Sequence, residues 1–278
     1  MKAIIRYPGA KWSLANWIIS HFPEEYEKMV YLEPFVGSGA VFFNKLPSAV
    51  ETVNDLNGDI VNLFRVLREH PEELKRLISL TPYAREEYDN SFLPCEDNVE
   101  KARRYIVRTT QAIGAKMDGK CGWRNHKQPK IGGTACKWCG ISDNITVAAE
   151  RLKGDTTHLV QIENMDALRL IERYNSDEVL MYLDPPYVRS TRKGGRLYSH
   201  EMTDDEQLQL LEIITRSQAK IVISGYESEM YNNALCSWYR FQTETRTTST
   251  ELVKEFIWTN FEPPQRQITL FERCFQNE

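Results

Sequence analysis

A five-residue apolar run, Val179 to Leu183, ends directly at Asp184, Pro185 and Pro186, and this junction constrains the fold more than any other stretch. The run is continuous rather than alternating, which is typical of a strand buried on both faces of a parallel sheet. Because prolines lack a backbone N–H, they cannot continue a central strand. The sequence therefore predicts a central strand over residues 179–183 with a carboxylate at its carboxyl end.

Similar apolar runs alternate with amphipathic helical stretches along most of the chain, which favours an α/β sheet. Further strands are predicted over residues 29–33, 51–55, 159–163 and 220–224, with an antiparallel pair over residues 240–245 and 255–260. Helices are predicted over residues 57–68 and 71–78, and over residues 143–153, where Gly154 is a plausible terminating glycine. Thr203 and Glu206 form the capping-box pattern that begins another helix.

The strand rhythm breaks between about residues 58 and 157, where the chain is first helical and then rich in Gly, Cys, Trp and Lys. We interpret residues 58–157 as a domain inserted into a discontinuous domain of residues 1–57 and 158–278. The segment from Lys101 to Lys153 contains twelve Lys and Arg but only three Asp and Glu, a local charge of +9. Since the whole chain has a net charge of −4, the remainder of the chain carries −13. Such segregation indicates a module that meets a polyanion, although a solvated helix face would give the same count.

Composition narrows the class of protein further. Apolar residues make up 41% of the chain and charged residues 27%, which is enough for a sizeable core. No apolar run approaches the roughly 20 residues that a membrane-spanning helix needs. Six cysteines in 278 residues do not suggest a disulfide framework. We therefore expect a soluble cytoplasmic protein with no membrane partner.

Two features suggest a nucleoside-containing ligand. Gly37 and Gly39 lie at a predicted strand-to-helix turn, where glycine allows close backbone approach to a ligand. Asp55 ends the next strand, about 20 residues later, where an acid can accept hydrogen bonds from ribose hydroxyls. Taken singly, the glycines could be an ordinary turn and Asp55 could cap a helix. The third glycine of the dinucleotide fingerprint is absent.

The junction at Asp184, Pro185, Pro186 and Tyr187 suggests recognition of a planar amine. The prolines fix the backbone and remove two donors, so the carbonyls before them can point at a ligand. The carboxylate and a carbonyl would accept the two amine hydrogens, while the tyrosine ring stacks on the base. The alternative is a proline-rich strand exit without a function.

The Asp-Pro-Pro-Tyr motif, the upstream Phe-Val-Gly-Ser-Gly and the N-terminal Tyr-Pro-Gly-Ala-Lys occur in an order that resembles the Dam-type family of DNA adenine-N6 methyltransferases. The resemblance covers nearly the whole chain. It implies a Rossmann-like S-adenosylmethionine-dependent methyltransferase fold, with a mixed seven-stranded sheet and an inserted, mostly helical target-recognition domain. It also implies a bacterial or phage-encoded enzyme, for which we expect a monomer and consider a cognate restriction endonuclease as a partner.

The resemblance assigns roles to individual residues. The cofactor-binding residues that it implies are Tyr7, Ala10, Lys11, Pro34, Phe35, Gly37, Gly39, Asp55, Asp166 and Asp184. Among these, Lys11 would pair with the cofactor carboxylate, and Asp166 would contact the cofactor adenine unless it only caps a helix. The catalytic residues are Asp184, Pro185, Pro186 and Tyr187.

The implied reaction moves a methyl group from S-adenosylmethionine to the N6 atom of an adenine flipped out of duplex DNA. Hydrogen bonds to Asp184 and to the Pro185 carbonyl would stabilise the charge that develops on the amine. Related motifs act on RNA adenine or on protein glutamine amide, and an inactive DNA-binding relative is a further alternative. The basic insertion favours DNA, and the intact motifs favour an enzyme.

The expected DNA-binding residues are Lys116, Lys120, Arg124, Arg189 and Arg192. Arg124 could read guanine through O6 and N7, although a phosphate contact is at least as plausible. The loop that holds Arg124 differs from that of GATC-reading relatives, so the target site is left open.

No metal is expected. Cys121, Cys136 and Cys139 include a Cys-x-x-Cys pair, but they lack the second pair of a strong zinc signature. Cysteines without a metal, in a loop that faces DNA, are the preferred interpretation.

Overall fold

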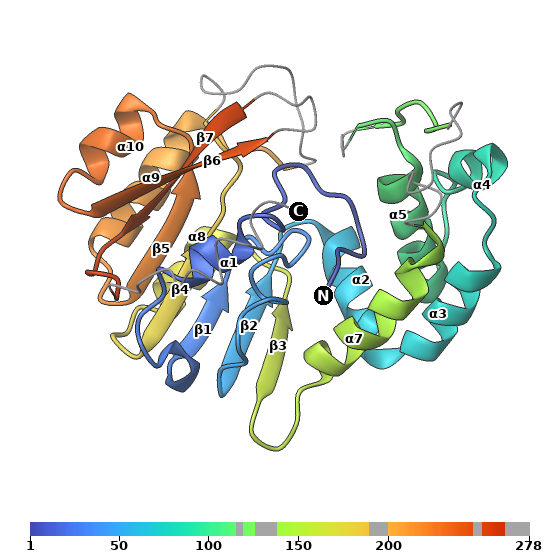
Figure 1. Ribbon diagram of the computed structural model, residues 1–278, viewed down its shortest axis with the longest axis horizontal. Helices are drawn as coiled ribbons and strands as arrows, with labels where there is room; N and C mark the ends of the chain where they lie inside the picture. The colour runs from blue at the N-terminus through green and yellow to red at the C-terminus, as the bar shows by residue number, and fades with distance from the viewer. Residues whose placement is uncertain (115–118, 126–137, 189–199, 247–251, 265–278) are drawn as a thin grey trace, which may run out of the picture.

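The computed structural model describes residues 1–114, 119–125, 138–188, 200–246 and 252–264. A seven-stranded sheet forms its centre, with strand order β3-β2-β1-β4-β5-β7-β6 (Figure 1). The strands are β1 Val30–Glu33, β2 Val50–Asn54, β3 Leu159–Glu163, β4 Val179–Leu183, β5 Lys220–Gly225, β6 Tyr239–Arg246 and β7 Leu252–Thr259. All seven predicted strands are confirmed, and β7 begins earlier than predicted because it pairs with β6 along its whole length.

Strands β1 to β5 are parallel to one another, and β7 is antiparallel to both β5 and β6. This is the mixed sheet that the sequence analysis expected. Every residue of β4 is buried, as its continuous apolar run predicted. Because β1 and β4 are central and parallel, their carboxyl ends lie together at one edge of the sheet.

Alternate residues of the central strands supply two separate hydrophobic cores, as expected from the twofold repeat of a strand. One face contributes Tyr31, Leu180, Tyr182, Val222 and Ile257 to a core shared with the N-terminal segment and the inserted helices. The other face contributes Leu32, Met181, Leu183, Ile221, Ile223 and Trp258 to a core with the helices that follow β3, β4 and β5. The sheet is therefore covered on both faces.

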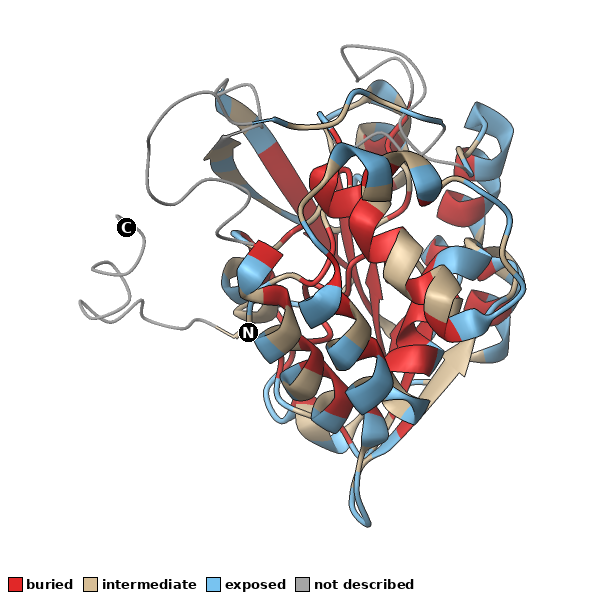
Figure 2. Cartoon of the chain, turned by 90° about the vertical axis from the view of Figure 1, so that its right-hand side faces the viewer, coloured by how far each residue is buried: buried red, intermediate tan, exposed pale blue. Residues whose placement is uncertain are grey.

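The chain between β2 and β3 is helical, as predicted. It contains α2 Gly58–Glu69, α3 Pro71–Leu80, α4 Arg85–Asn90, α5 Asn98–Gln111 and α7 Ile141–Lys153, which lie to the right of the sheet in Figure 1. In Figure 2, segments of buried residues alternate with intermediate and exposed ones along these helices, as expected of helices with one buried face. The core that these helices form is continuous with one face of the sheet. A boundary between two domains therefore stays a prediction.

Further helices complete the fold: α1 Ala15–Ile19, the 3-10 helix η1 Tyr26–Lys28, α8 Ala167–Arg173, α9 Asp204–Thr215 and α10 Glu229–Ala234. The predicted capping box is present at α9, where Thr203 and Glu206 satisfy each other's backbone N–H groups. Gly154 ends α7 with a φ of 66°, as expected of a terminating glycine. None of the helices in the described part of the chain has the length and apolar character that crossing a membrane requires.

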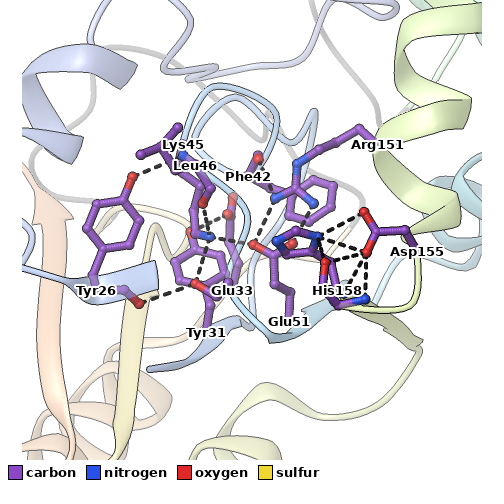
Figure 3. Close-up of polar contacts among 12 residues, drawn as sticks. Tyr26, Tyr31, Glu33, Phe42, Lys45, Leu46, Glu51, Arg151, Asp155 and His158 are labelled. Atoms are coloured by element: carbon purple, nitrogen blue, oxygen red, sulfur yellow. Dashed lines mark hydrogen bonds and ion pairs between the residues drawn. The ribbon is translucent and has the colours of Figure 1, made fainter. Parts of the chain in front are cut away.

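A group of buried charges joins α7 to the sheet (Figure 3). Lys45 and Glu51 form an ion pair with fully buried side chains, and Arg151 of α7 donates two hydrogen bonds to the same carboxylate. The Lys45 ammonium also lies 4.2 Å from the centre of the Tyr31 ring. We call Lys45, Glu51 and Arg151 the buried cluster. Because Arg151 of α7 and Lys45 both contact the carboxylate of Glu51 in β2, the cluster holds α7 against β2.

Candidate active site

A pocket opens where the carboxyl ends of β1, β2 and β4 meet. The predicted site residues that line it are Tyr7, Ala10, Lys11, Pro34, Phe35, Gly37, Asp55, Asp166, Asp184 and Pro186. These residues come from the N-terminal segment and from the segments that follow four different strands. The parallel strands bring them together, because each loop after a strand leaves the sheet at the same edge.

The glycine turn after β1 adopts the conformation that only glycine takes without strain. Gly37 has a φ of 49°, and a Cβ atom there would lie 2.8 Å from the Tyr7 ring. Gly39 has a φ of 71°, and a Cβ atom there would lie 2.7 Å from the Phe43 ring. Gly37 lines the pocket, whereas Gly39 lies outside its lining and allows close packing behind it.

Asp55 fastens the glycine turn to β2. Its carboxylate accepts hydrogen bonds from the backbone N–H groups of Gly37 and Asn57, each at 2.9 Å. Asn57, not Asp55, caps α2, which removes the capping alternative for the acid. Burial raises the pKa of Asp55 to about 6, although the two N–H donors oppose this shift. The carboxylate is held rigidly at the pocket wall.

Asp166 caps a helix and also lines the pocket, while its contact with the cofactor adenine stays a prediction. Its side chain caps α8 by accepting a hydrogen bond from the Arg169 N–H at 3.0 Å. The same residue lines the pocket together with Ala167 and Leu168. A cap at the start of a short helix therefore brings Asp166, from the segment after β3, to the pocket that Lys11 also lines.

Four residues form what we call the turn cluster: Lys11, Asp184, Tyr187 and Glu255. The Lys11 ammonium lies 3.1 Å from Asp184 Oδ1 and 3.4 Å from Glu255 Oε1, and it donates to the Gly9 carbonyl at 2.7 Å. The Tyr187 hydroxyl donates to Glu255 Oε1. The Lys11 ammonium thus has two protein carboxylates as partners, and its expected pairing with a cofactor carboxylate stays a prediction.

The turn cluster is only partly closed to solvent. Asp184 lines the pocket, and 21% of its side chain is exposed, whereas only 5% of the Lys11 side chain is exposed. Burial raises the pKa of Asp184, and the charge of Lys11 opposes the increase. Burial likewise raises the pKa of Glu255, again against the charge of Lys11. Asp184 is therefore the carboxylate of this cluster that can meet a ligand.

Tyr187 is almost buried in this state, with an exposed fraction of 7%. The Lys11 ammonium lies 4.7 Å from the centre of the Tyr187 ring. The Tyr226 ring packs edge-on against the Tyr187 ring, with 4.6 Å between the two ring centres. A base that stacks on Tyr187 must therefore displace one of the groups that now cover the ring.

The described DNA-binding candidates lie in the insertion. The Lys120 ammonium pairs with Asp89 at 2.7 Å. The carbonyl of Arg124 accepts a hydrogen bond from the Tyr83 hydroxyl. The positive charge of Arg124, together with burial as the larger cause, lowers the pKa of Arg6. The N-terminal segment therefore adds Arg6 to the basic residues near Arg124, a residue that the charge count by segment had overlooked.

Several sequence-based candidates lie outside the described residues: Lys116, Arg189, Arg192 and Cys136. Cys121 and Cys139 are described, and both are free thiols. Within the described ranges, no group of three His, Cys, Asp or Glu side chains is arranged to hold a metal ion.

Sequence patterns do not point to Glu255 or Glu33 as site residues. Glu33 lines the pocket and accepts a hydrogen bond from the Tyr31 hydroxyl at 2.6 Å, and burial raises its pKa to about 8. Glu255 begins the buried part of β7. Its only signal in the sequence is an acid directly before three apolar or aromatic residues, which is equally typical of a solvent-facing strand end.

Comparisons with known proteins identify the family of the chain. The family model described as D12 class N6 adenine-specific DNA methyltransferase matches residues 7–255. The chain is 25% identical to the type II methyltransferase M1.LlaDCHI of Lactococcus lactis subsp. cremoris, over 94% of this chain and 96% of that protein. It is 24% identical to the type II methyltransferase M.MjaIII of Methanocaldococcus jannaschii, over 81% and 84%.

A shorter stretch is more similar to a further protein. Over 71 residues, which are 26% of this chain and 24% of the relative, it is 35% identical to the DNA adenine methylase of Vibrio cholerae. The family model covers most of the chain, including the glycine turn, Asp55 and the turn cluster. The chain therefore belongs to the D12 class of N6 adenine-specific DNA methyltransferases.

Proposed function

We propose that Asp184 and the backbone beside it bind the amino group of an adenine flipped out of duplex DNA and orient it for methylation at a specific site. The observation that carries this proposal is the position of Asp184. Its carboxylate reaches the pocket from the end of a fully buried strand, where it pairs with Lys11, and Lys11 in turn contacts Glu255. A rigid strand end keeps such a group in place during the reaction.

The methyl donor is S-adenosylmethionine, and the pocket residues fit it. The Asp55 carboxylate can accept hydrogen bonds from the ribose hydroxyls of the donor. Asp166, which also lines the pocket, can accept from the amino group of the donor's own adenine. Gly37 leaves the wall open where a side chain would collide with Tyr7. When bound, the donor supplies an electrophilic methyl group.

The chain's own residues prepare the amine. An exocyclic adenine amine is a poor nucleophile because its lone pair is delocalised into the ring. Hydrogen bonds from its two hydrogens to the Asp184 carboxylate and the Pro185 carbonyl favour a pyramidal nitrogen and stabilise the positive charge that develops there. The product nitrogen then loses one proton, for which Asp184 Oδ is the nearest anionic acceptor. No covalent bond to the protein is needed.

Flipping the base costs a few kcal/mol, and stacking on Tyr187 recovers roughly 1–3 kcal/mol. Since Tyr187 is now covered by Lys11 and Tyr226, base entry must rearrange the turn cluster. We propose that residues 58–157 act as the target-recognition unit, where Lys120, Arg124 and the nearby Arg6 contact DNA. Phosphate contacts there would make the affinity sensitive to salt.

The test compares substrates directly. Purified protein is incubated with S-adenosylmethionine carrying a labelled methyl group and, in turn, with duplex DNA from a methylation-free host, with RNA and with protein. We expect label in DNA alone, and sequencing with N6-methyladenine detection should place it at one recurring sequence. Labelling of RNA alone, or of glutamine in protein, would contradict the substrate class.

Two further points belong to this proposal. We expect a monomer, which light scattering of the purified protein with and without DNA would check. A cognate restriction endonuclease is a partner to look for, because two relatives are named type II methyltransferases. An endonuclease gene beside the coding sequence would support such a partner.

A further inference from the structure

A fully buried glutamine on α9 contacts the catalytic turn. Gln207 has an exposed fraction of 0%, and its Nε2 donates to the Pro186 carbonyl at 2.5 Å. Its Oε1 accepts a hydrogen bond from the Tyr231 hydroxyl at 2.8 Å. Tyr231 is itself 2% exposed and packs against the Trp258 ring, 5.5 Å away between centroids. Both ends of the buried amide are therefore satisfied by named partners.

The chemistry of these partners fixes the direction of the glutamine amide. A proline carbonyl can only accept a hydrogen bond, so the NH₂ group of Gln207 must face Pro186. Its oxygen must then face Tyr231, whose hydroxyl donates. A leucine or methionine of similar size would fill the same space but would leave both the carbonyl and the hydroxyl without a partner, at a cost for each.

The turn needs such a donor because of its own sequence. Neither Pro185 nor Pro186 has a backbone N–H, so two of the donors that usually anchor a turn from within are absent. Among the described residues, no donor contacts the Pro185 carbonyl, whereas the next carbonyl along the chain is held by Gln207. The carbonyl proposed to accept from the adenine amine thus lies next to one that is held in place.

The helix that carries Gln207 is anchored independently. The Thr203 and Glu206 capping box fixes the first turn of α9 immediately before Gln207. Leu210, Leu211 and Ile214 bury the same helix against β4 and β5. Gln207 therefore works from a rigid support rather than from a loop.

We propose that Gln207, held by Tyr231, is a positioning residue that fixes the Pro186 carbonyl and so aims the Pro185 carbonyl and Asp184 at the adenine amine. This inference rests on the proposed function of Asp184. It adds a second support for the turn, on the side opposite the Lys11 and Glu255 contacts.

The experiment uses Gln207→Leu, Gln207→Glu and Tyr231→Phe in the full-length protein, with Gln209→Leu as the matched control. Gln209 lies on the same helix but is exposed. Steady-state kinetics on duplex DNA separate kcat from the KM for S-adenosylmethionine, and denaturant unfolding shows that each variant is folded. We expect Gln207→Leu to lower kcat by about 10- to 100-fold, the scale expected from misplaced reacting groups. The KM for the donor should change by less than about twofold, because the donor is not the group being misplaced.

The pH dependence separates positioning from simple packing. The carboxyl introduced by Gln207→Glu can donate to the Pro186 carbonyl only while it is protonated, and burial raises its pKa. Its kcat relative to wild type should therefore exceed that of Gln207→Leu near pH 6 and fall as the pH rises toward about 9. Tyr231→Phe should lower kcat by about threefold, since only the outer hydrogen bond is lost.

Opposite results would overturn the inference. They are a kcat for Gln207→Leu within twofold of wild type, or equal losses for Gln207→Leu and Gln207→Glu at every pH. In either case an active wild-type enzyme would leave the role of Asp184 intact. A wild-type protein that transfers no methyl group to DNA would overturn the proposed function and this inference together.

Discussion

Two lysines in this protein each lie beside a carboxylate and a tyrosine ring, yet they serve different ends. In the buried cluster, Lys45 and Arg151 contact the single carboxylate of Glu51, and the side chains of Lys45 and Glu51 are fully buried. In the turn cluster, Lys11 lies between two carboxylates, and Asp184 is 21% exposed toward the pocket. The first cluster has an excess of positive charge and the second an excess of negative charge.

The difference shows how one type of pair can be structural or functional. A closed group, in which each charge contacts an opposite charge, fixes how helices and strands pack together. Removing one of its charges therefore lowers the free energy of unfolding. An open group with one carboxylate more than it needs can release that carboxylate to a ligand while the lysine stays paired. Lys11 can give up Asp184 to an adenine amine because Glu255 remains beside it.

The largest effect should come from the exposed carboxylate. Asp184→Ala should lower methyl transfer at least 1000-fold, about 4 kcal/mol in the barrier, because the amine loses its charged acceptor. DNA affinity and the unfolding midpoint should stay close to wild type. Transfer of labelled methyl groups to DNA, a DNA-binding titration and urea unfolding measure the three quantities. The exposed Asp177→Ala is the matched control, and normal activity in Asp184→Ala would refute the mechanism.

The buried cluster should show the reverse. Glu51→Gln leaves two buried or partly buried cations without a counter-charge, so the free energy of unfolding should fall by about 3 kcal/mol. Denaturant unfolding measures this loss. Glu150→Gln, an exposed acid on α7, should change it by less than about 0.5 kcal/mol. Should Glu51→Gln unfold like wild type but lose activity, the division between the two clusters would be wrong.

Removing the second carboxylate of the turn cluster should sharpen the comparison. In Glu255→Gln the Tyr187 hydroxyl keeps an acceptor, but Lys11 can pair only with Asp184 and competes with the substrate amine for it. We expect kcat to fall by about tenfold, with most of the folding stability retained. Single-turnover methylation kinetics measure the chemical step, with the exposed Glu244→Gln as control. A rate equal to wild type would show that Glu255 does not hold Lys11 during the reaction.

The smallest effect concerns Asp55, whose carboxylate accepts two backbone N–H groups in place of a lysine. Burial raises its pKa to about 6, and ribose hydroxyls bind its ionised form. Affinity for S-adenosylmethionine should therefore be constant above about pH 7 and decrease as the pH falls through 6, by about fourfold at pH 5.5. Calorimetric titration across this range measures it. Asp55→Asn should bind weakly without that pH step, and a step that persisted would belong to another group.

Much of this molecule follows from local sequence patterns. The continuous apolar run of β4, the prolines that end it and the capping box of α9 each act within a few residues, so all three were predicted correctly. The glycine turn was also readable, because the φ values of Gly37 and Gly39 suit glycine alone. Likewise, the order of the motifs was enough to predict the family that the comparisons confirm.

What the sequence could not decide depends on contacts between distant segments. Glu255 meets Lys11 from the far end of the chain, and Gln207 meets Pro186 across 21 residues. The partner of a buried charge or amide is set by how strands and helices pack, and no periodicity encodes it. The sequence alone determined which strands and turns form and which chemistry they carry. Only the tertiary structure decided that Lys11 pairs with protein carboxylates and that one lysine cluster is closed while the other opens to a ligand, since burial and pairing exist only once the sheet has assembled.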